Sequence, residues 1–426
     1  MENRYDKYKD SGIAWIGEIP EHWEVIPHKR IMRKKKIIKE FYAGENILSL
    51  TKKGVIIRDL EAGGKMPTTF NGYQVLYPDN LLMCLFDIDV TPRCVGIIKD
   101  EGLSSPAYSQ FILNELGYTP FFDYLLRYMD DEKCLLHLSK NLRNSLTEDD
   151  FGQIETIVPS FPEQQAIADY LDWKCGEIDE LITLQEEMIT KLQSYKQSVI
   201  TEAVTKGLNK NVPLKDSGIE WIGKIPEHWK VAKIKSFYNV ILGKMVERNN
   251  DSNTGDENYL CAANIKWNGV DTEINKKMYF SDIEKEKYLL QYNDVLIMEG
   301  GMAGTACLYK NEFSPCYVQN SVNVCRAKKD FNNKFLYYWM YVPYYNGYID
   351  AICNKATIRH YTKEKVQNTP ILISSLVEQQ SIATYLDQRC SEIDELISIK
   401  QQKIEKLKEY KKSLIFECVT GKRKVS

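Results

Sequence analysis

The chain has 426 residues, of which 43% are hydrophobic and 27% are charged, and its formal net charge at pH 7 is −3. This length is too great for one ordinary hydrophobic core and predicts two or three domains of globular composition. The net charge has no global signature of nucleic-acid binding, so any such contact must come from local patches. No run of 18 apolar residues occurs, and residues 1–7 lack an apolar signal core. We therefore expect a cytoplasmic protein without a membrane span.

The eleven cysteines and five histidines do not predict a metal site. No Cys-x-x-Cys pair occurs, and the even spacing of Cys307, Cys316 and Cys325 matches no zinc-binding pattern. We therefore expect no structural zinc.

A short motif near the N-terminus is repeated in the middle of the chain. Residues 9–23 read KDSGIAWIGEIPEHW and residues 215–229 read KDSGIEWIGKIPEHW, an offset of 206 residues. The second copy matches the beginning of a phosphate-binding P-loop, but Ile225 stands where a Ser or Thr must follow the lysine. We interpret this motif, called the opener below, as a structural repeat that packs onto its domain.

A variable segment of about residues 25–159 follows the first opener. Its pattern predicts strands at 46–51, 54–58 and 81–86, helices at 111–116 and 120–129, and a last strand at 154–158. A basic run over residues 28–39 is either a phosphate-contacting surface or a solvated helix face. The candidate contacts to phosphates and base edges are Lys34, Lys35, Lys36, Lys52, Lys53, Arg58, Arg93, Lys140, Asn141, Arg143 and Asn144.

Each half of the chain ends in a long predicted helix, at about residues 160–205 and 375–420. Ser160 with Glu163, and Ser375 with Glu378, have the spacing of a helix-capping box. Apolar residues then recur at spacings of three and four over more than four heptads, which predicts a coiled coil. These seam residues are Leu171, Cys175, Ile178, Ile182, Ile189, Leu192, Val199 and Ala203 in the first helix, and Leu386, Cys390, Ile393, Ile397, Ile404, Leu407, Leu414 and Cys418 in the second.

The two helices are copies of one another, because an offset of 215 residues superposes Glu163 on Glu378 and the residues that follow. Two seam positions are polar in both copies, Gln185 with Lys400 and Lys196 with Lys411. Polar seam residues cost stability but restrict register and orientation. The alternative of a generic dimerisation helix is weaker, since both helices lie in one chain and each closes a separate globular segment.

The second variable segment, about residues 231–373, repeats the plan of the first with other residues. Residues 259–269 are a strand that runs into a polar turn, 292–298 is a turn followed by a strand, and 299–304 is a glycine-rich loop. Its candidate contacts are Lys244, Arg248, Asn264, Lys266, Asn268, Gln319, Asn320, Lys355, Thr357, Arg359 and His360. Each alone is more often a solvated loop residue, but two similarly built segments together favour a recognition surface.

The repeated order of opener, variable segment and long helix predicts a duplicated α+β protein. We expect a mixed α/β domain at residues 1–159 with its opener at 9–25, a long helix at 160–206, a second such domain at 207–374 with its opener at 215–231, and a second long helix at 375–426. The two helices should form an antiparallel coiled coil that joins and spaces the domains, with an internal pseudo-twofold repeat.

No motif for catalysis is found in the sequence. An Asn/Asp-Pro-Pro-Tyr/Phe motif, an S-adenosylmethionine-binding loop, a complete P-loop and a nuclease constellation are all missing, and nothing suggests a catalytic nucleophile. We therefore expect that the chain is not an enzyme and holds no cofactor and no metal of its own.

In its twin openers and its twin EQQ-x-IA-x-YLD helices, the chain resembles the specificity subunits of type I restriction-modification systems. The region of Asn264, residues 299–301 and residues 319–320 is similar to one class of the target-recognition domains of that family. The resemblance implies that each variable segment reads one half of a bipartite, asymmetric site in double-stranded DNA. It also implies that the helices space these domains and dock methyltransferase subunits, expected to be two, which carry S-adenosylmethionine.

A separate restriction subunit, where present, would supply translocation and cleavage with ATP and Mg. Residues 85–89 (LFDID) stand in the first segment where the second has Glu-Gly-Gly, so the two halves should read different sequences. Two alternatives stay open, a coiled-coil adaptor whose globular domains bind proteins and an enzyme with a degenerate site. The adaptor predicts no salt-dependent DNA binding, and the enzyme predicts cofactor binding by the isolated chain.

Overall fold

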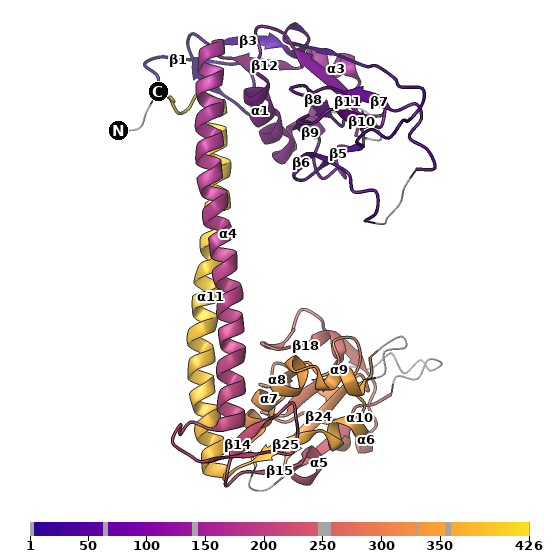
Figure 1. The fold of residues 1–426 in the computed structure, drawn as a ribbon, viewed down its shortest axis with the longest axis vertical. Coiled ribbons are helices and arrows are strands. Elements are labelled where there is room, and N and C mark those ends of the chain that lie inside the picture. Colours follow the sequence, from indigo (N-terminus) through magenta and orange to yellow (C-terminus); the bar gives the residue numbers. More distant parts are fainter. Residues whose placement is uncertain are drawn as a thin grey trace. The chain divides into compact units, whose positions relative to one another are not determined.

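The computed structural model describes residues 4–62, 67–138, 144–245, 257–328, 331–353 and 359–425. The chain forms two compact units, unit 1 with Met1–Glu186 and Gln401–Ser426 and unit 2 with Glu187–Lys400. Both boundaries lie inside long helices, α4 (Phe161–Lys206) and α11 (Leu376–Val419), so each unit contains a part of both helices (Figure 1). The expected α+β class with two long helices is confirmed.

Unit 1 is built around a four-stranded antiparallel sheet in the order β4-β11-β8-β9. Its strands are β4 (Met32–Lys34), β11 (Ser109–Leu113), β8 (Leu81–Met83) and β9 (Val95–Ile97). Two-stranded ladders join β1 (Tyr8–Asp10) with β2 (Glu18–Pro20), β3 (Glu24–Pro27) with β12 (Glu155–Val158), β5 (Leu48–Thr51) with β6 (Gly54–Ile57), and β7 (Gln74–Leu76) with β10 (Gly102–Ser104). The helices that precede α4 are η1 (His28–Arg30), α1 (Thr119–Asp131), α2 (Cys134–Leu138) and α3 (Glu148–Gln153).

Unit 2 has a four-stranded antiparallel sheet in the order β16-β24-β21-β22. Its strands are β16 (Tyr238–Leu242), β24 (Val322–Ala327), β21 (Val295–Met298) and β22 (Ala306–Leu308). The smaller sheets contain β13 (Leu214–Asp216) with β14 (Lys224–Pro226), β15 (Lys230–Lys233) with β25 (Pro370–Ile373), β18 (Ile265–Lys266) with β19 (Gly269–Val270), and β17 (Glu257–Leu260) between β20 (Lys276–Met278) and β23 (Tyr317–Val318). Its shorter helices are α5 (Ile234–Phe237), η3 (Ala262–Asn264), α6 (Asp282–Tyr288), α7 (Asn333–Trp339), α8 (Tyr341–Tyr345), α9 (Tyr348–Ile352) and α10 (Lys363–Asn368).

The two units share one plan. In each four-stranded sheet, the strand that comes fourth in the sequence lies between the strands that come first and second in the sequence. The third strand lies at the edge, beside the second. In each unit a ladder, β3–β12 or β15–β25, ties the strand after the opener to the strand before a long helix. The two variable segments therefore have the same fold, although their sequences differ.

Each unit has a hydrophobic core to which the opener and both long helices contribute. In unit 1, Trp23 of the opener, Phe121 of α1 and Leu171 of α4 are fully buried in one cluster. In unit 2, Trp229 of the opener and Leu386 of α11 occupy the corresponding cluster. The expectation that each opener packs onto its domain is confirmed.

The seam residues predicted for the long helices are all buried or half-buried, as a coiled coil requires. Two of the polar seam lysines form ion pairs across the helices. In unit 1 Lys411 donates to both carboxylate oxygens of Asp179 at 2.7 Å, and in unit 2 Lys196 contacts Asp394 in the same way at 2.7 Å. Early α4 thus pairs with late α11 in unit 1, and late α4 with early α11 in unit 2, which makes the helices antiparallel.

Two expectations about local structure are wrong. Residues 111–116, predicted as a helix, begin inside β11, where Gln110 and Phe111 are buried between β4 and β8. A short apolar run does not distinguish a buried strand from a helix, and here the strand pairing decides. The basic run at 28–39 is not one helix face, since it passes from η1 into β4 and its first residue, His28, is buried.

Within the described residues, no helix is long and apolar enough to cross a membrane. In that same part of the chain, no three His, Cys, Asp or Glu side chains are placed to share a metal ion. The cysteines are free thiols, and all except the half-buried Cys134 are buried, as expected of small core residues.

The buried His28 makes the stability of unit 1 depend on pH. Its ring is fully buried and stacks on Phe151 with 4.5 Å between the ring centroids. Nδ1 of His28 donates to the carbonyl oxygen of Phe151 at 3.2 Å. Burial lowers the pKa of His28 to about 4, because the charged ring would lose its hydration.

We predict that unit 1 loses stability as the pH falls from about 6.5 to about 4, because in this window the unfolded chain binds a proton that the folded ring does not. The loss approaches about 3 kcal/mol at the lower end. Replacing His28 by Phe should remove this contribution, whereas the carboxylates titrate in both proteins. Hydrogen exchange of the β3 and α3 amides at several pH values measures the difference, and equal pH dependence in the two proteins would contradict the prediction.

Candidate functional site

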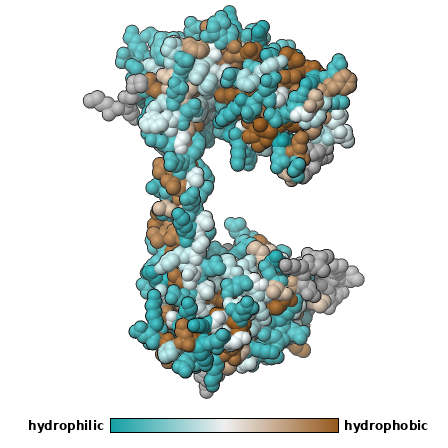
Figure 2. All heavy atoms as spheres, in the orientation of Figure 1, coloured by the Kyte–Doolittle hydropathy of each residue, from teal (hydrophilic) through white to brown (hydrophobic). Residues whose placement is uncertain are grey.

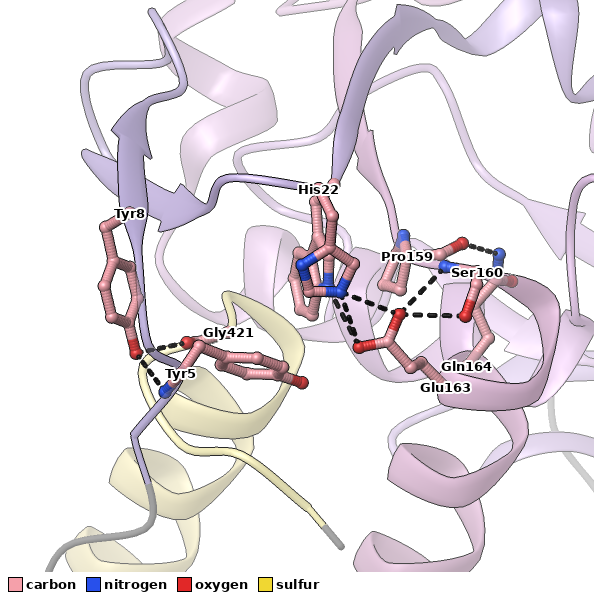
Figure 3. Close-up of polar contacts among 9 residues, drawn as sticks. Tyr5, Tyr8, His22, Pro159, Ser160, Glu163, Gln164 and Gly421 are labelled. Carbon is pink, nitrogen blue, oxygen red and sulfur yellow. Dashed lines mark hydrogen bonds and ion pairs between the residues drawn. The ribbon is translucent and has the colours of Figure 1, made fainter.

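The opener and the start of a long helix contact each other in unit 1 (Figure 3). The carboxylate of Glu163 accepts hydrogen bonds from Nε2 of His22 at 2.9 Å and from Nε1 of Trp23 at 3.4 Å. The same carboxylate caps α4 by accepting from the backbone nitrogen and the hydroxyl of Ser160, at 3.3 and 2.8 Å. Burial raises the pKa of Glu163, but the hydrogen bonds from His22 and Ser160 outweigh burial and hold this pKa below its usual value.

The next residue of the helix motif joins the globular part of unit 1 to the helix. Gln164 is fully buried, and its Oε1 accepts a hydrogen bond from the backbone nitrogen of Tyr118 at 2.7 Å. Its Nε2 donates to the carbonyl oxygen of Leu116 at 2.8 Å. It also donates to the carbonyl oxygen of Pro159 at 2.9 Å (Figure 3). A buried amide with all of these bonds made holds α1, the preceding loop and α4 in one arrangement.

Unit 2 repeats both contacts with the equivalent residues. Nε2 of His228 lies 3.2 Å from Oε2 of Glu378. Gln379 accepts a hydrogen bond from the backbone nitrogen of Asn332 at 3.1 Å and donates to the carbonyl oxygen of Ser374 at 3.0 Å. The opener and the helix motif are therefore two halves of one joint, which explains why they occur together in each half of the sequence.

A third repeated contact was not found from the sequence. The hydroxyl of Tyr124, on α1, donates to Asp172 of α4 at 2.7 Å, and the hydroxyl of Tyr338, on α7, donates to Asp387 of α11 at 2.8 Å. The two tyrosines are 214 residues apart, close to the offset of the long helices. That spacing was the available signal, but a single matching tyrosine is too little to identify a repeat.

The far end of each long helix packs beneath the tryptophan of an opener. Gly207 follows α4 and Gly421 follows α11, and both have a left-handed φ of 72°. A Cβ at Gly421 would lie 2.4 Å from Pro20, and one at Gly207 would lie 3.4 Å from the Trp229 ring. The hydroxyl of Tyr8 also donates to the carbonyl oxygen of Gly421 at 3.1 Å (Figure 3). Glycine is required at 421 because a Cβ there would clash with Pro20. The end of α11 therefore packs against the opener of unit 1.

In unit 1 several of the predicted contact residues already have partners. Lys34 forms an ion pair with Glu148, and Arg93 forms one with Asp131 at 2.8 Å. Nζ of Lys35 lies 3.6 Å from the centroid of an aromatic ring. These side chains could contact DNA only by keeping or exchanging these partners.

The other candidates of unit 1 differ in exposure. Lys52 and Lys53 are exposed in the turn between β5 and β6, which Arg58 follows. Lys36 is exposed, with its Nζ 3.2 Å from the carbonyl oxygen of Pro106. Asn144 is half-buried and has a left-handed φ of 45°. Lys140, Asn141 and Arg143 lie outside the described residues.

In unit 2, candidates from three separate segments come together at the end of β21. The backbone of Lys244 forms an isolated parallel β-bridge with Gln319. The carbonyl oxygen of Lys244 accepts a hydrogen bond from the backbone nitrogen of Asn320 at 2.9 Å. His360 lies beside the glycine that follows Glu299, through the pairing of Gly300 with His360. We call Lys244, Glu299, Gln319, Asn320 and His360 the polar rim of unit 2.

Asn264 has a structural role, contrary to the expectation from the sequence. Its side chain is fully buried, and Oδ1 accepts a hydrogen bond from the backbone nitrogen of Cys261 at 3.0 Å. Its Nδ2 donates to the carbonyl oxygens of Asp271 at 2.8 Å and Ile274 at 2.7 Å. No capacity remains for a base edge.

Three of the remaining candidates of unit 2 have exposed side chains. Lys266 and Asn268 are exposed on the β18–β19 hairpin, which Trp267 anchors by packing on Tyr341 with 4.1 Å between the ring centroids. Arg359 is exposed and forms an ion pair of 2.6 Å with Asp350. Arg248, Lys355 and Thr357 lie outside the described residues.

Comparisons with known proteins point to one family. A family model described as "Type I restriction modification DNA specificity domain" matches residues 226–409. The chain is 24% identical to the "Putative type I restriction enzyme MjaX specificity subunit" of Methanocaldococcus jannaschii, over 96% of each protein. It is 23% identical to the type I restriction enzyme MjaVIII specificity subunit of the same organism, over 65% of this chain and 63% of that protein.

Two solved structures share the fold. One is a chain from work on complex assembly and conformational transition of the type I R-M system, with a TM-score of 0.72 and 13% identity over 94% of this chain and 98% of that chain. The other is the HsdS subunit of Thermoanaerobacter tengcongensis, with a TM-score of 0.54 and 15% identity over 95% of this chain and 98% of that chain.

Proposed function

We propose that this chain, which belongs to the specificity subunits of type I restriction-modification systems, reads one half of a bipartite, asymmetric DNA site with each unit. The proposal rests on one observation: the two units share their fold but present different surface residues. Both units have the same sheet order and the same helix joints. One presents the Lys52–Lys53 turn and the other the polar rim, as two different half-sites require.

The side chains at these surfaces are of the types that contact DNA. The exposed Lys36, Lys52 and Lys53 suit phosphates. The amide side chains of Gln319 and Asn320, which also hydrogen-bond each other, are of the type that reads base edges. The net charge of −3 does not oppose this, because charges further away than about 8–10 Å are largely screened in physiological salt.

The long helices are the elements that would set the gap between the half-sites. Each is continuous across the boundary between units, and cross-helix pairs such as Lys411–Asp179 and Lys196–Asp394 favour one register. Half-site spacing follows protein geometry in other DNA-binding proteins, so the recognised site should have a gap of fixed length.

Methylation and cleavage would belong to partner subunits. Methyltransferase subunits would bring S-adenosylmethionine, and a restriction subunit, where present, would use ATP and Mg. This chain would supply recognition and positioning without catalysis of its own. The rival interpretation, an adaptor whose globular domains bind proteins, is not favoured by the family membership.

Equivalent apolar residues on the helices suit two copies of one methyltransferase partner. Leu181 and Leu184 of unit 1 are 42% and 45% exposed, and Leu396 and Ile399 of unit 2 are 47% and 51% exposed. Within each pair the spacing of three puts both side chains on one helix face, and Figure 2 shows hydrophobic side chains exposed along the long helices. Acidic neighbours such as Glu180 and its equivalent Glu395 would favour a partner with a basic rim.

We predict that replacing Leu181 and Leu184 by Ser lowers the number of bound methyltransferase subunits from two to one, because one of the two docking surfaces then has no apolar side chains to bury. Replacing Leu396 and Ile399 by Ser should do the same, and all four changes together should abolish assembly. Native mass spectrometry of the co-expressed complex counts the subunits. Serine at the exposed Gln193 and Gln402 is the control. Two subunits bound to the fourfold variant would exclude this surface.

The proposed function predicts that the two variable segments act independently. Exchanging residues 25–159 for the equivalent segment of a related chain should change one half of the methylated motif and leave the other half unchanged, because the joints to α4 and α11 are kept. Single-molecule methylome sequencing of a host that carries the chain and its methyltransferase measures the motif. If both halves changed, or if no bipartite motif appeared with the native chain, the proposal would be wrong.

Another prediction concerns phosphate contacts in unit 1. Replacing Lys52 and Lys53 by Ala should weaken binding to specific and non-specific duplexes alike. The slope of log affinity against log salt should become smaller by about 0.9 for each phosphate that a lysine no longer neutralises. Fluorescence anisotropy of the methyltransferase complex gives the slope, with alanine at the exposed Lys210 as the control. An unchanged slope would assign these lysines to a solvated turn.

A further inference from the structure

Glu299 is the acidic member of the polar rim, and its backbone is held on both sides. It follows β21 directly, its nitrogen donates to the carbonyl oxygen of Ser321 at 2.9 Å, and its carbonyl oxygen accepts from the nitrogen of Tyr361 at 2.7 Å. The side chain is half-buried, and its Oε2 is buried without a hydrogen-bond partner among the described residues. A carboxylate oxygen taken out of water without a donor costs free energy, so this position calls for an explanation.

The same backbone position in unit 1 shows that the fold does not need a carboxylate there. Val295 of β21 and Leu81 of β8 occupy the same place in the two sheets, which makes Leu85 the equivalent of Glu299. The carbonyl oxygen of Leu85 accepts from the nitrogen of Leu146 at 2.8 Å, the same contact that Glu299 makes. Leu85 is 5% exposed and belongs to the hydrophobic core. An apolar side chain fits this position in unit 1. The fold therefore does not require the carboxylate that unit 2 has there.

The polar neighbours of Glu299 in the described residues bond to one another and not to its carboxylate. Nε2 of Gln319 donates to the side chain of Asn320 at 2.6 Å, and the hydroxyl of Ser321 donates to Oε1 of Gln319, so these neighbours are occupied with one another. Burial raises the pKa of Glu299, and the nearby His360 opposes this shift. The glycines that follow Glu299 add no side chain beside it.

The chemistry of DNA limits what such a carboxylate can pair with. Phosphate oxygens repel it, so it cannot serve the contact that lysines make. Among base edges in the major groove, hydrogen-bond donors are the N4 amino group of cytosine and the N6 amino group of adenine. We propose that Glu299 is a specificity-determining residue that accepts a hydrogen bond from the exocyclic amino group of one cytosine or adenine in the half-site read by unit 2. This inference rests on the proposed function.

Two variants of Glu299 test the inference in the complete chain with its methyltransferase. Glu299→Leu installs the residue that unit 1 uses, and Glu299→Gln keeps the size but adds a donor. Glu286→Gln, at an exposed position of α6, is the matched control. The probe is the genomic DNA of the expression host, read by methylome sequencing, and thermal unfolding of each variant checks the fold.

With Glu299→Leu we expect discrimination at one base of the unit 2 half-site to fall by about 5- to 150-fold, because leucine cannot accept the hydrogen bond from the base edge. The other half-site and the gap should not change. With Glu299→Gln, a position that is cytosine in the native motif should shift toward adenine, because Gln pairs with N6 and N7 of adenine. A native adenine should instead be kept by Gln and lost by Leu. The control variant should methylate the native motif.

The opposing outcomes are distinct. If Glu299→Leu fails to fold, the isosteric Gln variant still tests the inference. Its methylated motif shows whether Glu299 contacts cytosine, contacts adenine or contacts neither base. Folded variants that methylate the native motif with unchanged discrimination would overturn the inference and leave the proposed function standing. An equal loss of methylation at all sites would also overturn it, because a residue with only a structural role would give that result. A native chain that produces no bipartite motif would overturn the proposed function and this inference together.

Discussion

The buried amide at the start of each long helix is the contact on which the arrangement of each unit depends. Gln164 and Gln379 are fully buried, so their donors and acceptors must find partners inside the protein. Those partners are backbone groups in front of α1 and α7 and at the end of the loop that leads into the helix. A recognition domain can therefore attach to its helix in one way only, whatever residues its outer surface has.

This attachment explains how one fold can serve two different surfaces. The opener contributes a tryptophan to the core and a histidine to the carboxylate that caps the long helix, in both units. Because these contacts use residues outside the variable segments or backbone groups within them, the surface residues are free to differ. Leu85 and Glu299 illustrate this freedom, since the same backbone contact supports a core leucine in one unit and a half-buried acid in the other.

Charge has two separate roles in the chain. Along the helices, lysines at polar seam positions pair with aspartates of the facing helix, where a wrong register would leave them without a partner. On the recognition surfaces, some basic side chains are already paired, as Arg93 is, while Lys52 and Lys53 are exposed. A count of basic residues therefore overstates the surface available to phosphates, and the burial and partners of each side chain decide its role.

The sequence by itself determined the duplication, the openers, the capped helices and their seam. A repeat is found by comparing two stretches of sequence, and a cap or a hydrophobic period is a property of nearby residues. It also showed the resemblance to the type I specificity subunits, through motifs that form the joints. Only the tertiary structure decided that residues 111–113 belong to a strand and that Asn264 is buried with every hydrogen bond made. It also decided that Oε2 of Glu299 has no hydrogen-bond partner among the described residues. The physical reason is that these outcomes depend on partners tens of residues away or on burial by distant elements. A local pattern reports which residues prefer to be buried, but not which donors, acceptors and charges will meet them there.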